Sequence, residues 1–167
     1  MQEHIMIYHN LDQEFLKILE RNAVRAVIRN EINEVLLIQT NLGDYKFPGG
    51  GIEEGENELQ ALIREIREEC GFETKEINEH IFRIIEQKED KHDKNTKFVM
   101  NSNYYTCTID NTIIHSQSLD QYERDLEYKP VWIKIEKAIK ENKKIICDLN
   151  RKKTMWIKRD TFVLELL

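Results

Sequence analysis

Residues 50–72 read GGIEEGENELQALIREIREECGF, and this stretch joins a glycine-rich turn to a helical pattern. Three consecutive glycines at 49–51 break regular structure and permit a sharp turn. From residue 57 to residue 70, apolar residues recur at spacings of three and four, which predicts a helix. Gly71 then stands where a glycine at the C-terminal cap is expected. The stretch therefore predicts a loop, an amphipathic helix and a second turn.

The predicted helix carries three carboxylates on one side. On a wheel of about 100° per residue, Glu65, Glu68 and Glu69 project into one sector roughly 100° wide. The neighbouring sector is apolar and is expected to pack against a sheet; it holds Leu59, Leu62, Ile63, Ile66 and Cys70. Like charges three and four residues apart repel, and Glu69 lies near the negative end of the helix dipole. A hard cation such as Mg²⁺ or Mn²⁺ would offset this repulsion, although an acidic helix face is more often only solvated.

The glycine turn and the acidic helix together fit one gapped pattern, G-x5-E-x7-R-E-U-x-E-E-x-G-U, in which U is a bulky apolar residue. Its fixed positions are Gly50, Glu56, Arg64, Glu65, Ile66, Glu68, Glu69, Gly71 and Phe72. This pattern resembles the Nudix box of the Nudix hydrolases and matches it without an insertion over 23 of the 167 residues. The resemblance implies a single domain over residues 1–167 in the α/β class. The family fold is an α/β/α sandwich with a mixed central β-sheet, in which the box forms a loop–helix–loop.

The rest of the chain reads as one unit of strands and helices without an internal repeat. The patterns that predict strands lie at 23–30, 34–40, 80–87, 97–110 and 129–135. The first two are expected to form a hairpin, and the third and fourth to flank an exposed hairpin loop. A short helix is predicted at 136–142 and a closing helix within 152–167. This mixture agrees with a mixed sheet between helices.

Composition and charge exclude several classes of protein. Apolar residues make up 40% and charged residues 34% of the chain, which fits a globular protein and not a disordered one. No apolar stretch approaches the roughly 18–20 residues of a membrane-spanning helix, so no membrane association is expected. The formal net charge of −6 argues against unaided binding to nucleic acid, so DNA is not an expected partner. Three widely spaced cysteines and no visible secretory signal predict free thiols in the cytoplasm.

The resemblance implies a reaction and a set of roles. Nudix hydrolases cleave a nucleoside diphosphate linked to a further moiety, and they use Mg²⁺ or Mn²⁺. The metal ligands that the resemblance implies are Glu65, Glu68, Glu69 and the carbonyl of Gly50. Glu56 would assist at the metal site from outside the direct ligands, and Arg64 would hold the catalytic carboxylates through a salt bridge. Such a metal neutralises phosphate charge and lowers the pKa of a bound water.

The general base can come either from the box or from a distant loop. The loop before the strand at 129–135 holds Glu123, Asp125 and Glu127. We favour Glu127 as the base and take Glu123 as the next candidate. Either carboxylate could instead be an additional metal ligand or an ordinary surface acid, and the sequence does not separate these roles.

Contacts with the substrate are expected from the strands beside the box. Arg25 and Lys46 could contact phosphates, although solvated charges are the alternative for both. Phe47 and Tyr105, together with Tyr104, could stack on a nucleobase, and core packing explains these aromatic residues equally well.

The substrate class follows by elimination among Nudix subgroups. No proline occurs between Pro48 and Pro130, whereas the ADP-ribose subgroup often has one a short distance past the box. The NADH-type and coenzyme A signatures are absent, and residues 88–92 lack the tyrosine of the dinucleoside polyphosphate subgroup. A MutT-like enzyme remains, with a small-molecule nucleotide, either a nucleoside triphosphate or a modified nucleotide, as substrate. Alternatives are pyrophosphate removal from RNA 5′ ends and a non-catalytic nucleotide sensor. The chain is expected to be a monomer or a homodimer.

Overall fold

The protein is described here by a computed structural model that places residues 1–8, 11 and 14–167. In chain order, its elements are β1 (Gln2–Ile7), β2 (Lys17–Ile28), β3 (Val35–Gln39), β4 (Tyr45–Lys46), α1 (Glu58–Cys70), β5 (Phe72–Glu89), β6 (Thr96–Ile114), α2 (Gln121–Asp125), β7 (Lys129–Ile133), α3 (Ile135–Cys147) and α4 (Ile157–Leu166). Among the described residues, no helix is long and apolar enough to cross a membrane.

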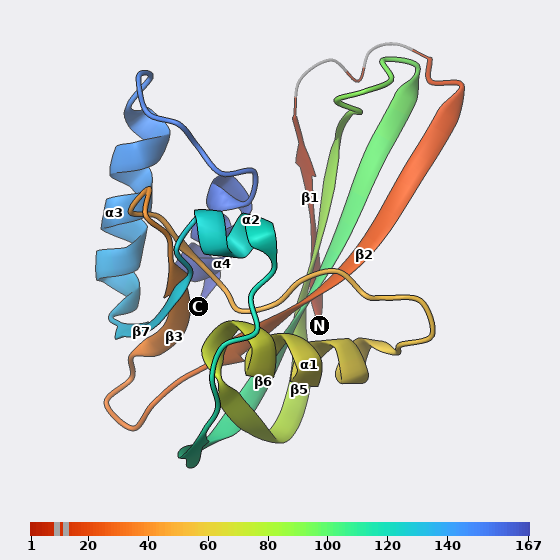
Figure 1. The fold of residues 1–167 in the computed structure, drawn as a ribbon. Coiled ribbons are helices and arrows are strands. Elements are labelled where there is room, and N and C mark those ends of the chain that lie inside the picture. Colours follow the sequence, from red (N-terminus) through yellow and green to blue (C-terminus); the bar gives the residue numbers. More distant parts are fainter. Residues whose placement is uncertain (9–10, 12–13) are drawn as a thin grey trace.

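The strands form two sheets. The larger sheet has the order β1-β5-β6-β2, in which β5 and β6 are antiparallel while β1 and β2 run parallel to their neighbours. The smaller sheet has the order β4-β3-β7 and is antiparallel. The long β5–β6 hairpin confirms the predicted strand pair, and it carries the larger sheet well beyond α1 (Figure 1).

Helices cover both sides of these sheets. Helix α1 lies on one side, whereas α3 and α4 lie together on the other (Figure 1). Alternating residues of β3 show this division: Leu36 and Ile38 pack in the core that contains α1, and Val35 and Leu37 pack in the core that contains α3 and α4. Because strand side chains alternate between faces, one short strand serves both cores. The predicted α/β/α layering is thus observed.

The strands at 23–30 and 34–40 were predicted to pair as a hairpin, but they belong to different sheets. Strand β2 pairs with β6, and its other edge is occupied by the glycine-rich segment 48–51. Ala26 N donates to Pro48 O at 2.8 Å, and Val24 N donates to Gly50 O at 3.0 Å. Strands β2 and β3 are connected by a tight turn with a single bridge, so they diverge into different sheets.

Helix α1 begins and ends as predicted. The Asn57 side chain accepts from Gln60 N, and the Gln60 side chain accepts from Asn57 N, which forms a capping box. Gly71 has a left-handed backbone with φ of 75° and ends the helix. These local signals fix the helix without reference to the rest of the fold.

The buried face of α1 differs from the predicted stripe. Leu59 and Ile63 are 47% and 43% exposed, so the prediction that they pack against the sheet was wrong. Glu65 and Glu69 are buried in their place, beside Ala61, Leu62, Ile66 and Cys70. The helix is rotated so that two carboxylates face residues 46–50, where Lys46 and Gly49 bind Glu69 and Gly50 lies against Glu65.

Strand β4 is only two residues long and is held by the C-terminal helices. Asn142 of α3 accepts from Tyr45 N at 2.8 Å and donates to Tyr45 O at 3.0 Å. Asp160 of α4 accepts from Phe47 N at 3.0 Å. All four residues are buried, so these bonds satisfy backbone groups that have no water to replace them. The segment that leads into the glycines is therefore fixed from the side opposite α1.

Candidate functional site

Glu69 lies at the floor of the site and is 1% exposed. One of its oxygens pairs with Lys46 Nζ, and the other accepts from Gly49 N at 2.8 Å. Lys46 also donates to Gly49 O at 3.2 Å. Burial raises the pKa of Glu69 to about 7; Lys46 opposes this rise, and the neighbouring Glu65 adds to it. Burial thus disfavours the charged form of Glu69.

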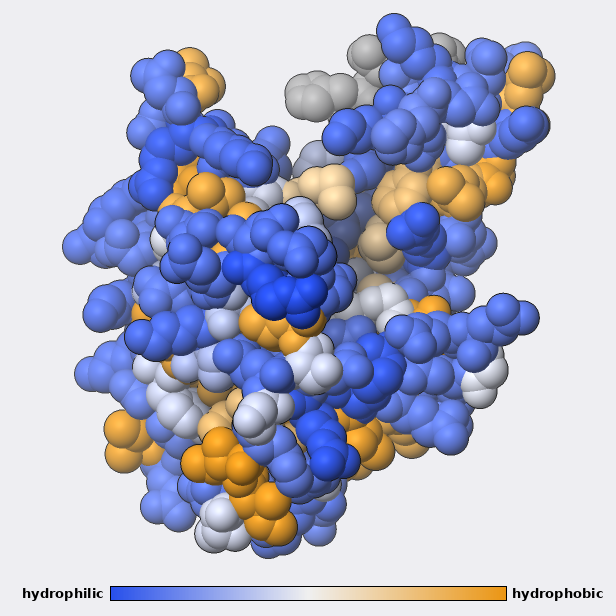
Figure 2. Space-filling model, in the orientation of Figure 1, coloured by the Kyte–Doolittle hydropathy of each residue, from blue (hydrophilic) through white to orange (hydrophobic). Residues whose placement is uncertain are grey.

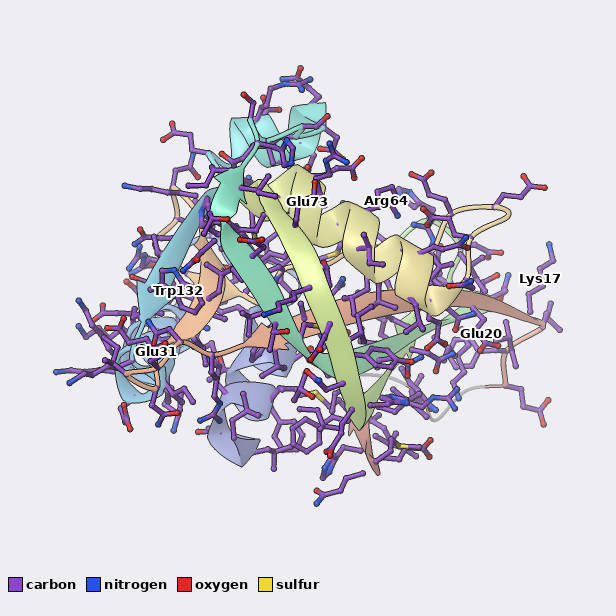
Figure 3. All side chains as sticks on the ribbon, turned by 90° about the horizontal axis from the view of Figure 1, so that it is seen from below. Lys17, Glu20, Glu31, Arg64, Glu73 and Trp132 are labelled. Carbon is purple, nitrogen blue, oxygen red and sulfur yellow. The ribbon has the colours of Figure 1, made fainter. Side chains whose placement is uncertain are left out.

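Arg64 binds three carboxylates around the mouth of the site. Its Nε and Nη2 donate to the two oxygens of Glu56 at 2.6 and 3.0 Å. Its Nη1 donates to Glu65 at 2.8 Å and to Glu68 at 2.9 Å, and Nη2 also donates to Gly51 O at 3.0 Å. The hydrogen bonds from Arg64 lower the pKa of Glu56 to about 2. Arg64, labelled on α1 in Figure 3, thus fixes the orientation of these side chains.

Two of the three glycines, Gly49 and Gly50, are required by close approach of the backbone. A Cβ atom on Gly49 would lie 2.9 Å from Arg25 Cα, and the φ of Gly49 is 135°. A Cβ atom on Gly50 would lie 2.6 Å from Glu65 Cδ, so the backbone at residue 50 lies directly against that carboxylate. Gly51 has open space around the same position. The Gly50 carbonyl accepts from Val24 N, which leaves its second lone pair for another partner.

A third carboxylate comes from α2. Carboxylate oxygens of Glu65, Glu69 and Glu123 all lie within 4.8 Å of one another. Glu123 accepts from Asp120 N at 2.9 Å, and Asp120 accepts from Glu123 N at 2.8 Å, so a capping box sets this side chain in place. Burial raises the pKa of Glu123. Helix α2 was not predicted, but D-x-x-E at 120–123 is the sequence signal that could have found it.

The remaining predicted carboxylates lie outside this group of three. Glu68 is half-exposed and bonds to Arg64. Glu127 is exposed, with a left-handed backbone at φ of 53° just after α2. The fold therefore brings Glu123 to the box carboxylates, and it does not bring Glu127 into the same group.

This group of three fits a divalent cation. All of its donors are carboxylate oxygens, the type that Mg²⁺ and Mn²⁺ prefer. Glu65 and Glu69 are buried as near neighbours, which is unfavourable for two anions unless positive charge lies between them. Lys46 supplies part of that charge from one side.

The predicted aromatic contacts with a nucleobase are not equivalent. Phe47 is 0% exposed and packs edge-on against Tyr104 at 5.4 Å between centroids. A ring without exposed surface cannot stack on a ligand, so the prediction for Phe47 is corrected to a core role. Tyr105 lies near the start of α1, where its hydroxyl bonds to Glu58 and its ring stacks on His80 at 4.6 Å. One face of Tyr105 is therefore already occupied.

The two predicted cations are both buried near the site. Arg25 is 7% exposed, and among the described residues no carboxylate lies within ion-pairing distance of it. Its Nη1 donates to Val24 O at 2.9 Å, and its Nε has no partner. Lys46 Nζ lies 4.7 Å from the ring centre of Tyr128 and 5.7 Å from that of Trp156. These two aromatic residues were not predicted as part of the site.

Comparison with known families and proteins gives one family. The family model described as NUDIX domain matches residues 19–149. The chain is 34% identical over 82 residues to the m7GpppN-mRNA hydrolase of Saccharomyces cerevisiae, covering 46% of this chain and 8% of that protein. It is 42% identical over 59 residues to the RNA pyrophosphohydrolase of Ruthia magnifica, covering 35% and 33%. It is 40% identical over 52 residues to the 8-oxo-dGTP diphosphatase of Escherichia coli, covering 28% and 40%. The matched segments span less than half the length of each of these relatives.

Solved structures agree on the fold. A NUDIX hydrolase from Nitrosomonas europaea has a TM-score of 0.58 at 16% identity, covering 89% of both chains. The ORF135 protein of E. coli has a TM-score of 0.52 at 22% identity, covering 73% of this chain and 79% of that one. At these identities, the likeness concerns the fold alone.

The contact between Gly50 and Glu65 gives a matched pair of variants. Gly50→Ala places a methyl group against the Glu65 carboxylate, whereas Gly51→Ala places one in open space. We expect Gly50→Ala to weaken Mn²⁺ binding by about 10-fold or more, the range typical when metal ligands lose their orientation, and Gly51→Ala to leave it unchanged. Calorimetric titration measures this, with circular dichroism to verify folding. Equal affinity in the two variants would contradict the steric role of Gly50.

Proposed function

Since this chain belongs to the Nudix family, we propose that it hydrolyses the pyrophosphate linkage of a nucleoside diphosphate joined to a further group, with Mg²⁺ or Mn²⁺ as cofactor. The observation that carries the proposal is the convergence of Glu65, Glu69 and Glu123 within 4.8 Å, in a site that Lys46 only partly neutralises. An acidic site of this kind attracts a polyphosphate only when a divalent cation is bound there.

Each residue of the site has a role in this reaction. Glu65 and Glu69 would hold the metal, which when bound neutralises phosphate charge and activates water, and Glu123 faces the same site. Arg64 keeps Glu65 in place by a hydrogen bond of 2.8 Å, so the carboxylate does not have to reorient during the reaction. Gly49 N and Lys46 hold the two oxygens of Glu69 in the same way.

We assign the general base to Glu123. It is half-buried, its pKa is raised by burial, and it lies at the site on a helix fixed by Asp120. A carboxylate with a raised pKa accepts a proton from water more readily than an ordinary surface carboxylate. Glu127, the first choice from the sequence, becomes an ordinary surface acid in this proposal.

The substrate proposal has two parts. The MutT-like interpretation favours a nucleoside triphosphate or a modified nucleotide, with Arg25 and Lys46 as phosphate contacts. A second candidate, pyrophosphate removal from RNA 5′ ends, is favoured by the relatives named RNA pyrophosphohydrolase and m7GpppN-mRNA hydrolase. A non-catalytic sensor is disfavoured because every glutamate of the box is present.

The buried free thiols Cys70 and Cys107 suit the proposed cytoplasmic location.

A panel of substrates tests the reaction. Nucleoside triphosphates, oxidised deoxynucleoside triphosphates, ADP-ribose, ADP-glucose, dinucleoside polyphosphates and triphosphorylated RNA are incubated with Mg²⁺ or Mn²⁺, and released phosphate species are measured. We expect turnover of at least one, abolished by chelator and reduced at least about 100-fold in Glu69→Gln. That variant should remain folded, since glutamine keeps the shape of the side chain. No turnover of any substrate would overturn the proposal.

A second prediction separates the two candidate bases. Glu123→Gln is expected to lower kcat by about 10²-fold or more, because it removes the proposed proton acceptor. Glu127→Gln, four residues away, is the matched control and should change kcat less than about twofold. Steady-state kinetics of both variants on the best substrate of the panel provide the measurement. A larger loss in Glu127→Gln than in Glu123→Gln would reverse the assignment.

Arg25 should show opposite effects on stability and activity. A buried guanidinium without a carboxylate partner is costly, and replacing it with an apolar side chain of similar length is often neutral or stabilising. We therefore expect Arg25→Met to unfold at the same or a higher temperature, while its KM for the nucleotide rises about tenfold through loss of a charged hydrogen bond. Thermal unfolding and kinetics check the two halves. A destabilised variant with normal KM would assign Arg25 to structure alone.

A further inference from the structure

Strand β2 carries three cations on one face. Lys17, Arg21 and Arg25 are four residues apart and pair with Thr96, Met100 and Tyr104 of β6, respectively. Since Tyr104 lies in the core with α4 and strand residues alternate, all three cations lie on the α4 side of the sheet. At about 3.3 Å per residue, this cationic strip extends about 26 Å from Arg25 to Lys17. Lys17 lies at its outer end, at the start of β2 (Figure 3).

The acidic residues on the same face as the strip are paired with another cation. Glu86, in the row of Arg21, and Asp160 both form ion pairs with Arg159. Glu20, the acidic residue of β2, lies on the opposite face and bonds to Asn101. Among the described residues, no carboxylate forms an ion pair with Arg21 or Arg25. Lys17 lies near Asp93, whose pKa it helps to lower. Lys17 and Arg21 are therefore exposed positive charges in a chain whose net charge is −6, and Arg25 continues their line into the buried interior.

The inner end of the strip reaches the candidate site. The buried Tyr128 ring lies under the Lys46 ammonium. Burial raises the pKa of the Tyr128 hydroxyl, and the charges of Glu69, Glu123 and Arg25 also affect this pKa. The backbone of Arg25 lies against Gly49, whose N donates to Glu69, while Arg21 and Lys17 lead outward along the edge strand of the sheet.

Aromatic and apolar side chains accompany the cations. Phe98 of β6 lies between Leu19 of β2 and Lys88 of β5, its partners on the two neighbouring strands. The Lys88 ammonium lies 5.2 Å from the Phe98 ring centre. Lys158 of α4 lies 5.9 Å from the ring centre of Tyr8. Phe98 is partly exposed and Leu19 is 42% exposed. Figure 2 shows a hollow between the part of the larger sheet that extends beyond α1 and the part of the molecule that contains α3 and α4.

We propose that the cationic strip binds the chain of a single-stranded RNA whose 5′-terminal polyphosphate enters the candidate site. A mononucleotide would reach only the inner end of the strip, whereas a polynucleotide presents phosphates along its whole length. Regular cations beside partly exposed aromatic rings are the arrangement that binds single strands without sequence preference. This inference rests on the proposed function. Water attacks one phosphorus, one P–O–P bond breaks, the leaving phosphate oxygen takes the proton, and a shortened 5′ phosphate remains on the RNA.

The test compares an RNA with the matching mononucleotide. The substrates are an unstructured 5′-triphosphorylated RNA of about 12 nucleotides, within the length that such grooves bind, and the nucleoside triphosphate of its first base. We expect a KM for the RNA about tenfold lower than for the mononucleotide, and a steeper dependence of this KM on salt. The double variant Arg21→Gln with Lys88→Gln should remove this advantage and reduce the salt slope by about 1.4, which corresponds to two phosphate contacts.

The control variant removes two charges elsewhere. Lys97→Gln with Lys75→Gln alters one lysine on the opposite face of the larger sheet and one on the distant part of β5, so the KM for RNA should not change. Anisotropy of a 3′-labelled RNA with a 5′ monophosphate measures binding independently of hydrolysis. Binding that depends on Arg21 without any hydrolysis would support the strip and refute the proposed reaction. Hydrolysis with equal KM for both substrates, or equal losses in both double variants, would refute the strip.

Discussion

A carboxylate buried on the inner face of α1 requires the surrounding structure to supply a positive charge and a hydrogen-bond donor. Glu69 has almost no exposed surface, and its partners are Lys46 and Gly49 N. Both partners come from the segment after β3, in which β4 is too short to fix itself by strand pairing. Asn142 and Asp160, from the two helices on the other side of the molecule, hold that segment through its backbone. The C-terminal helices are therefore part of the support of the site, although none of their residues enters the group of three carboxylates.

The electrostatics of the site have two levels. At the mouth, Arg64 binds Glu56, Glu65 and Glu68 in partly exposed positions, where ion pairs stabilise little but fix orientation. At the floor, Lys46 forms the ion pair with Glu69. Glu123 adds a further negative charge from α2. Carboxylates therefore outnumber cations, and the metal-free site is held together against repulsion. Such an arrangement costs stability and is understandable when a divalent cation completes it.

The sequence predicted what depends on local spacing. The bounds of α1, its C-terminal glycine and the presence of Glu65 and Glu69 at the site follow from the pattern over residues 50–72. A helical wheel gives angles between side chains, but it does not say which sector faces inward, so Leu59 and Ile63 were placed in the core in error. Burying a carboxylate rather than a leucine is decided by Lys46 and Gly49, which lie outside the helix, 23 and 20 residues before Glu69 in the chain.

The choice between Glu123 and Glu127 required tertiary structure for a similar reason. Both belong to one loop, and only the turn at α2 decides which carboxylate reaches α1.

The distribution of charge on strand β2 also could not be predicted from composition. A net charge of −6 describes the whole chain, yet alternation along one strand places Lys17, Arg21 and Arg25 on a single face. The carboxylate group is the feature that the family pattern led us to expect, whereas the cationic strip lies outside residues 50–72, where that pattern predicts nothing. The identity of the group attached to the pyrophosphate is therefore to be sought along β2 and not within the box.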